Sequence, residues 1–259
     1  MTSAEIVKQY QEEGYVVIPD VIDEELVQEA RGHIEWMGRK YPDIRPEQYH
    51  HYLIADDPFW LRLCADPRLM DVIEPFIGSD IALFGAHYIS KPARTGQPVL
   101  WHQDGYYWPL EPMEVITIWL AVDDSTPENG CMRVIPRTHR DQRIFSHRVS
   151  QDIPNVLSSE LDMRVVDADS AVDVVVPAGG VSLHDPYLIH GSEANLSDQR
   201  RCGLTLRYIP TTTRIKRENH AAYLCRGEKI EGINWYPEWP KFRPGDHHPF
   251  RGCDRTPWI

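Results

Sequence analysis

The stretch VLWHQDGYYW, residues 99–108, carries a histidine and a carboxylate two positions apart, in a run with the apolar residues of a buried β-strand. Burying a carboxylate is costly unless another group compensates its charge. Side chains two positions apart on a strand point to the same face, so His102 and Asp104 can approach one metal ion while Gln103 points elsewhere. The alternative to metal binding is that His102 and Asp104 form a buried, hydrogen-bonded pair without a metal. The stretch therefore predicts a strand that presents a candidate metal-ligand pair.

Other short β-rich runs flank this stretch between about residues 80 and 210, and turn residues separate them. Such spacing is typical of a β-sandwich or barrel and differs from that of alternating β-α units. We expect residues 80–210 to form the β core of a single domain that spans residues 1–259. The runs are IALFGAHYIS (81–90), EVITIWLAVDD (114–124), MRVIP (132–136), AVDVVVPAGGVSLHD (171–185) and LTLRYIPTT (204–212).

Helix signals come before the β-rich region. Ser3 can cap a helix over residues 4–13, and Asp23 can cap a second helix that has two glutamates in its first turn. A third helix is expected over residues 67–77, where a proline begins the pattern and a glycine follows it. The sequence thus predicts a mainly β fold with α-helices on its N-terminal side.

The C-terminal residues, 211–259, have a different character. Their last thirty positions are rich in proline and aromatic residues and show neither helical nor strand periodicity. We expect this segment to wrap over the barrel as an ordered coil or to act as a lid.

Composition restricts the classes of function. The chain has 259 residues and a formal net charge of −12, which argues against nucleic-acid binding because phosphate backbones select clustered Lys and Arg. Five cysteines without a CxxC pair indicate a reducing compartment rather than a disulfide framework or a zinc site. A signal-peptide pattern and a run of 18 apolar residues are both absent. We expect a cytoplasmic protein that binds a small molecule, without nucleic-acid or membrane partners; no pattern indicates its oligomeric state.

A metal site needs further ligands. His190 is the candidate for a second histidine, and His184, six residues earlier, is its rival. Two histidines and one carboxylate on one side of an ion leave the opposite positions open, an arrangement that suits non-heme Fe(II). A second His-x-Asp pair, His139 and Asp141, lies among charged, turn-like residues, where a solvated loop is the better interpretation.

Five motifs follow one another from about residue 8 to residue 210. They are YQEEGYVVIPDVIDEELV (10–27), SKP (90–92), WHQDGYYWP (101–109), WLAVDDSTPENGCMRVIPRTH (119–139) and HDPYLIHGSEANLSDQRRCGLTLRY (184–208). In this order they make the chain resemble the phytanoyl-CoA dioxygenase family of Fe(II)- and 2-oxoglutarate-dependent oxygenases. The resemblance implies a double-stranded β-helix, a cupin-like jelly roll, with flanking N-terminal α-helices. It also implies that His102, Asp104 and His190 bind the iron.

The resemblance further implies a site for 2-oxoglutarate. The family arginine that holds the distal carboxylate lies eleven residues after the second histidine ligand, which is Arg201 here. A planar fork of donors suits a carboxylate. Arg200 and Arg207 are the alternatives on the same segment. Arg200 would face the other side of a regular strand, and Arg207 is expected to be an outer-strand charge or a charge in the layer behind the residues that touch the cosubstrate. The full expected set of cosubstrate-binding residues is Arg201, Ser192, Trp119, Gln103 and His87. His139 matches the family's P-x-x-H segment instead of a metal site.

The carboxylate ligand bears on the reaction. Halogenating relatives replace it with a small residue so that chloride can bind, whereas this chain has Asp104. The resemblance therefore implies hydroxylation of a C–H bond, with Fe(II), 2-oxoglutarate and O2 as cofactor and cosubstrates and with release of succinate and CO2.

The substrate is less well defined. Tyr106, Tyr107 and Trp108 follow the ligand pair and are candidate substrate contacts, either for a cationic group or as simple packing at the barrel rim. The basic segment TTTRIKRE (211–218) could meet an anionic substrate, but a solvated strand edge is expected. Because other basic sequence is sparse, a free small molecule is favoured over a CoA thioester.

Two other classes of function remain open. A metal-dependent hydrolase or isomerase on a similar barrel would need the three metal ligands but not Arg201. A non-catalytic ligand-binding barrel would need neither, and the fold alone does not separate these classes.

Overall fold

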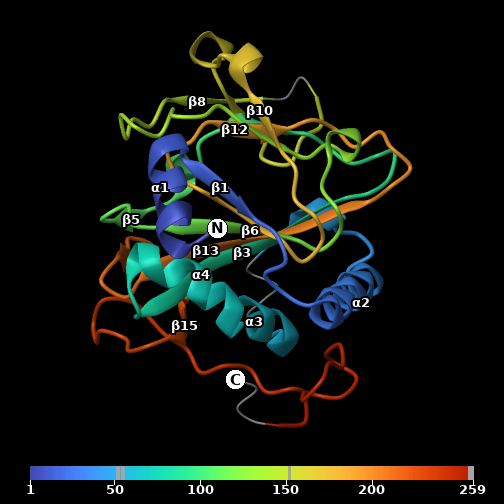
Figure 1. Ribbon diagram of the computed structural model, residues 1–259. Coiled ribbons are helices and arrows are strands. Elements are labelled where there is room, and N and C mark those ends of the chain that lie inside the picture. The colour runs from blue at the N-terminus through green and yellow to red at the C-terminus, as the bar shows by residue number, and fades with distance from the viewer. Residues whose placement is uncertain (51–52, 54–55, 151–152, 256–259) are drawn as a thin grey trace.

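The computed structural model describes residues 1–50, 53, 56–150 and 153–255. Two antiparallel sheets lie face to face, and helices cover the outer side of the larger one (Figure 1). The helices are α1 (Ser3–Glu13), α2 (Glu24–Lys40), α3 (Pro58–Cys64) and α4 (Pro67–Ile77). Within the described ranges, no helix combines the length and the apolar character needed to cross a bilayer.

The two sheets have defined strand orders. The larger sheet runs β1 (Tyr15–Ile18), β11 (Val181–His184), β6 (Ile116–Ala121), β13 (Arg201–Pro210), β3 (Ile81–Lys91), β15 (Tyr223–Arg226), and β2 (Tyr49–His50) also pairs with β3. The smaller sheet runs β10 (Val172–Val174), β7 (Met132–Val134), β12 (His190–Ser192), β4 (Val99–His102). Two short pairs stand apart, β14 (Arg214–Ile215) with β5 (Leu110–Glu111) and β8 (His147–Val149) with β9 (Ser159–Leu161).

The path of the chain identifies the architecture. From β3 the chain passes to the smaller sheet at β4, returns at β6, crosses again to β7 and β10, and then visits β11, β12 and β13 alternately. Eight antiparallel strands wound between two sheets in this order form a jelly roll. The predicted double-stranded β-helix is confirmed.

Strand β13 shows how the sequence separates core from cavity. Cys202, Leu204, Leu206 and Tyr208 point outward into the hydrophobic core shared with the helices. The alternate residues of this strand face the space between the sheets. The apolar side chains on one face of β13 thus pack against the helices, and the other face is available for a binding site.

The predicted N-terminal helices form with small differences. Asp23 caps α2, since its Oδ1 accepts a hydrogen bond from the Leu26 amide at 2.9 Å. The expected cap of the first helix, Ser3, is wrong. Thr2 has the extended backbone of a cap, and its hydroxyl and amide exchange hydrogen bonds with Glu5 as a capping box, so Ser3 already lies inside the helix.

The C-terminal segment packs mainly on the helical side of the molecule. After β15 its described part forms no helix or strand, and Trp239, Phe242 and Phe250 join the core around the helices. Phe250 contacts the ring of Phe59 on α3, and the coil passes beneath α3 in Figure 1. None of the described residues of 211–255 lines the cavity described below, so we describe the segment as a wrap; residues 256–259 lie outside the described residues.

Candidate active site

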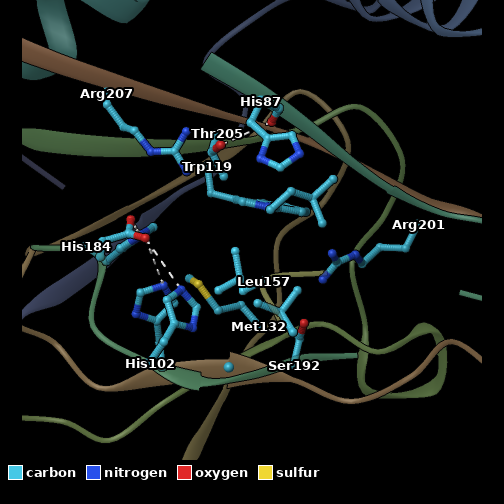
Figure 2. A pocket seen from close by; sticks show the side chains of 15 residues that line it. His87, His102, Trp119, Met132, Leu157, His184, Ser192, Arg201, Thr205 and Arg207 are labelled. Atoms are coloured by element: carbon cyan, nitrogen blue, oxygen red, sulfur yellow. Dashed lines mark hydrogen bonds and ion pairs between the residues drawn. The ribbon is translucent and has the colours of Figure 1, made fainter. Parts of the chain in front are cut away.

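A cavity of about 50 Å³ lies between the two sheets (Figure 2). Its walls combine apolar side chains with histidines, one carboxylate and two arginines. The lining residues are His87, Ile89, Val99, His102, Asp104, Trp119, Met132, Leu157, His184, His190, Gly191, Ser192, Arg201, Thr205 and Arg207.

Three of these residues form the candidate metal centre. His102 ends β4 and pairs in register with His190 on β12, and their ring centroids are 4.1 Å apart. Potential ligand atoms of His102, Asp104 and His190 all lie within 4.8 Å of one another, and all three residues are buried. The three predicted ligands are therefore brought together.

The route by which Asp104 reaches the site differs from the expectation. The strand ends at His102, and Asp104 begins a 3-10 turn, Asp104–Tyr107, so the argument that both residues share one strand face is wrong. The Gly105 amide donates a hydrogen bond to the Pro186 carbonyl at 2.9 Å instead of pairing with a neighbouring strand. The chain therefore turns away from the sheet at this point. The turn still directs the carboxylate toward the two imidazoles.

The histidines present the correct atoms to a metal. Nδ1 of His102 lies 2.8 Å from the Leu100 carbonyl, and Nδ1 of His190 lies 3.0 Å from the Leu188 carbonyl. A carbonyl only accepts, so each Nδ1 carries the proton and each Nε2 keeps its lone pair. Burial, followed by the nearby His102, holds the pKa of His190 well below its usual range, which favours the neutral imidazole that a metal requires.

Asp104 is held by a third histidine. Its Oδ1 lies 3.5 Å from Nε2 of His102 and 4.0 Å from Nε2 of His190, while its Oδ2 lies 3.3 Å from Nε2 of His184. Burial alone would raise the pKa of Asp104, but contacts with His102 and His184 and the charge of Arg207 outweigh it and hold the pKa well below its usual range. An ionised oxygen and two imidazole lone pairs thus face one point, a donor set that fits Fe(II).

His184, the rival ligand, has a different place. It contacts the Asp104 oxygen that is turned away from the other two histidines, and Oδ1 is the oxygen left for the metal. Outer partners of this kind orient a ligand, and their loss typically lowers metal affinity about 10- to 100-fold.

We therefore expect His184→Ala to weaken Fe(II) binding by about 10- to 100-fold, because Asp104 loses the donor that orients it. Anaerobic calorimetry with Fe(II) measures this. The control is His139→Ala, which removes a buried histidine whose Nε2 bonds to the Gln11 carbonyl outside the cavity. Unchanged Fe(II) affinity in His184→Ala would contradict the positioning role.

Arg201 enters the cavity from the end opposite to His102 (Figure 2). The residue is 1% exposed, and its Nη1 donates to the Gly130 carbonyl at 2.8 Å. Its Nε is buried and has no hydrogen-bond partner among the described residues. Burial lowers the pKa of Arg201 to about 10, so the group remains charged at neutral pH. A buried cation with an unused donor fits the distal carboxylate of 2-oxoglutarate.

Lys91 is a buried polar residue near Ser192 and Arg201. In the sequence it is noted only as part of the motif SKP. Its Nζ donates to Ser192 Oγ at 2.7 Å and also contacts the Gly130 and Glu193 carbonyls. Burial, followed by repulsion from Arg201, lowers the pKa of Lys91 to about 5. The sequence signal for Lys91 is a lysine at the end of a strand in which every residue except His87 is buried. Its hydrogen bond holds Ser192 in the cavity wall.

Trp119 forms the cavity wall between the two ends. Its ring lies 5.2 Å from the Arg201 guanidinium carbon and crosses β13 at Gly203. A Cβ built at Gly203 would lie 1.9 Å from Cζ2 of Trp119, so only glycine allows the indole to lie there.

We expect Gly203→Ala to lower the free energy of unfolding by roughly 1–3 kcal/mol, because a buried methyl group must displace the packed indole. Chemical denaturation measures the change. The control is Gly38→Ala in the last turn of α2, where the nearest atom to a new Cβ is 3.8 Å away and alanine favours the helix. Equal stabilities of the Gly203→Ala variant and the native chain would contradict this packing.

Two other expected cosubstrate residues differ in position. His87 lines the cavity, and its Nε2 lies 2.8 Å from the Glu47 carbonyl. Gln103 does not line it. Its amide nitrogen donates to two backbone carbonyls and its amide oxygen accepts from the Phe145 amide, so we assign Gln103 the role of fixing the loop behind the site.

The three aromatic candidates for substrate contacts lie beside the cavity rather than in its wall. Tyr106 is 45% exposed and stacks on His147 at 4.0 Å. The hydroxyl of Tyr107 lies 2.5 Å from Ser159 Oγ. Trp108 packs edge-on against Phe84 at 6.0 Å. Packing at the rim therefore accounts for most of their contacts.

Of the remaining candidates, Arg200, His139 and Asp141 lie outside the cavity, and Arg207 lies in its wall. Arg200 faces away, as expected, and forms an ion pair with Asp123 at 2.7 Å. Arg207 does not lie on the outer side of its strand, which is one of the two places expected for it. Its side chain lines the cavity on the same face of β13 as Arg201, and there its charge acts on the ligand Asp104.

Residues 10–203 match the phytanoyl-CoA dioxygenase (PhyH) family. The chain belongs to this family. Membership and the His-Asp-His centre together make it an Fe(II)- and 2-oxoglutarate-dependent oxygenase, as the sequence motifs predict.

One similar protein and two solved structures are compared with the chain below. The L-proline trans-4-hydroxylase of Streptomyces griseoviridis is 27% identical over 227 residues, which cover 78% of this chain and 85% of that protein. The structure of the non-heme monooxygenase ThoJ superposes with a TM-score of 0.78 at 22% identity, covering 91% of this chain and 88% of the other. EctD from S. alaskensis, solved with 2-oxoglutarate and 5-hydroxyectoine, gives a TM-score of 0.67 at 19% identity, covering 93% and 88%. These neighbours share the jelly-roll fold of this phytanoyl-CoA dioxygenase family member.

Proposed function

We propose that this protein hydroxylates a C–H bond of a free small molecule and converts 2-oxoglutarate to succinate and CO2 in the same reaction. One observation carries the proposal. A metal-ligand centre and the buried cation Arg201, which has a donor to spare, face the same cavity from opposite ends (Figure 2). The metal centre and Arg201 together match a short dicarboxylate that chelates the metal with one end and accepts hydrogen bonds from the arginine with the other.

The residues divide the work. His102, His190 and Asp104 would hold Fe(II) from one side and leave its other positions open to the cavity. Arg201 and Ser192 would hold the distal carboxylate of 2-oxoglutarate. Bound Fe(II), with 2-oxoglutarate and O2, supplies the oxidising power for breaking the C–H bond.

The cavity wall protects the reaction from water. Val99, Met132, Leu157 and Ile89 give the centre an apolar surrounding, and the indole of Trp119 closes the wall beside Arg201. These apolar side chains limit the access of water to the metal centre. Because Asp104 occupies the carboxylate position, hydroxylation is favoured over halogenation.

The alternative functions explain less. A hydrolase or isomerase has no use for Arg201, whose buried Nε would stay unpaired at a considerable free-energy cost. A non-catalytic barrel leaves three metal-ligand atoms facing one another without purpose. Cys64, Cys131, Cys202 and Cys225 are free thiols, which supports a reducing, cytoplasmic location.

Succinate formation tests the proposal. Purified protein with Fe(II), 2-oxoglutarate and O2 should release succinate slowly even without substrate, and omission of any one of the three should stop it. A mixture of small metabolites that contains the substrate should accelerate this release. Succinate release that is independent of Fe(II), or none under any condition, would contradict the proposal.

A further inference from the structure

Arg207 is a cation whose guanidinium forms no hydrogen bond or ion pair with the part of the chain that the structure describes. It lies on β13 with its side chain in the cavity, and Figure 2 shows it at the end opposite to Arg201. No hydrogen bond or ion pair of the guanidinium joins it to another described residue, and its Nε is buried without a partner. Asp104 influences it electrostatically but forms its close contacts with histidines instead. The guanidinium N–H donors of Arg207 are therefore available for a ligand.

The guanidinium is nevertheless held in place. Its central carbon lies 5.5 Å from the centre of the Trp108 ring, and Trp108 packs against Phe84. The backbone of Arg207 pairs with β3 on one side and with β6 on the other. A cation fixed by an aromatic face and by a central strand is preorganised for binding. The Trp108 ring already contacts the Arg207 guanidinium. This argues against the binding of a cationic substrate group to the same ring.

The charges in the cavity favour an anion at Arg207. Asp104 and the chelating end of 2-oxoglutarate would offset the two charges of Fe(II), and Arg201 would offset the distal carboxylate. Lys91 is bound by Ser192 and two backbone carbonyls, and since it carries no negative charge in either protonation state it cannot offset Arg207. Arg207 then remains as an uncompensated positive charge in a largely apolar cavity, which is costly until an anion joins it.

We propose that Arg207 binds an anionic group of the substrate, a carboxylate or a phosphonate or phosphate, and so holds the substrate beside the metal centre. The planar guanidinium can donate two parallel hydrogen bonds to any of these groups. The substrate is therefore a small organic anion. This assignment rests on the proposed function, since it takes the other end of the cavity to be filled by 2-oxoglutarate.

Calorimetry with simple probes tests the proposal without knowledge of the substrate. The protein is loaded with Fe(II) and saturating 2-oxoglutarate in the absence of oxygen, and acetate, methylphosphonate or the neutral acetamide is then titrated. We expect at least one of the two anions to bind at least tenfold more tightly than acetamide, and which one binds distinguishes a carboxylate from a phosphonate or phosphate. In Arg207→Gln this anion should bind at least tenfold more weakly.

Two further variants complete the test. Arg217→Gln removes an exposed arginine of the neighbouring basic segment and should bind the anion as the native chain does. Arg207→Lys keeps the charge but loses the planar fork, so it should give an intermediate affinity, and it decides the matter if Arg207→Gln does not fold.

The outcomes separate this assignment from the proposed function. Native protein that binds neither anion, or binds it equally well in the folded Arg207 variants, would overturn the role of Arg207 while 2-oxoglutarate binding persists. Native protein that fails to bind 2-oxoglutarate at all would instead overturn the proposed function.

Discussion

Replacing His190 with alanine is expected to abolish both iron retention and succinate formation. The substitution leaves one imidazole and one carboxylate, and two such ligands rarely hold Fe(II) against water. The iron content of the desalted protein and the succinate released from 2-oxoglutarate measure the two effects. His139→Ala, a buried histidine outside the cavity, is the control and should retain iron. Normal turnover in His190→Ala would end the assignment of the metal centre.

Arg201→Ala is expected to weaken 2-oxoglutarate binding by about 30- to 4000-fold, because removing one partner of a buried ion pair typically costs roughly 2 to 5 kcal/mol. Arg201→Lys should be intermediate, since it keeps the charge and loses the two-pronged geometry. Calorimetry with Fe(II) present and oxygen excluded measures the affinity.

The neighbouring arginine provides the matched control for this change. Arg200 is paired with Asp123 on the outer side of the sheet, so Arg200→Ala should change 2-oxoglutarate affinity only a few fold. Iron should stay bound in both variants. If Arg201→Ala binds 2-oxoglutarate as the native chain does, Arg201 does not hold the cosubstrate.

Much of the fold could be predicted because its strands have strong and separate signals. The run of residues 81–90 corresponds to β3, and the continuous apolar run in residues 114–124 contains β6, which is buried along its whole length. Strands buried on both faces give such continuous runs. The helix over Pro67–Ile77 was predicted at its observed boundaries, since proline and glycine mark both ends.

Other elements could not be found from pattern alone. The helix α3, Pro58–Cys64, has only seven residues, and all but one of them are buried, so it shows no amphipathic period. The turn at Asp104 depends on a hydrogen bond from Gly105 to Pro186, and a contact between such distant positions leaves no local signal. The capping box at Thr2 was visible as a threonine three residues before Glu5, but the adjacent serine obscured it.

The site was predictable where the family motif and strand geometry agree. Strand alternation correctly separates Arg200 from Arg201. The same period of two places Arg207 with Arg201 on the cavity face, which excludes the outer-strand position that was one of the two expected for it. The choice of His190 over His184 depends on tertiary pairing, because His190 lies opposite His102 while His184 lies in the other sheet. Spacing along the chain does not reveal that difference.

The most direct test of the whole account is an anaerobic titration of the protein with Fe(II) and 2-oxoglutarate, followed by visible absorption. The account predicts a weak charge-transfer band that appears only when both are present, saturates at one equivalent of each per chain, and is absent in His190→Ala. A band that needs no 2-oxoglutarate, or no band at saturating concentrations of both, would contradict the claim that this cavity binds them together.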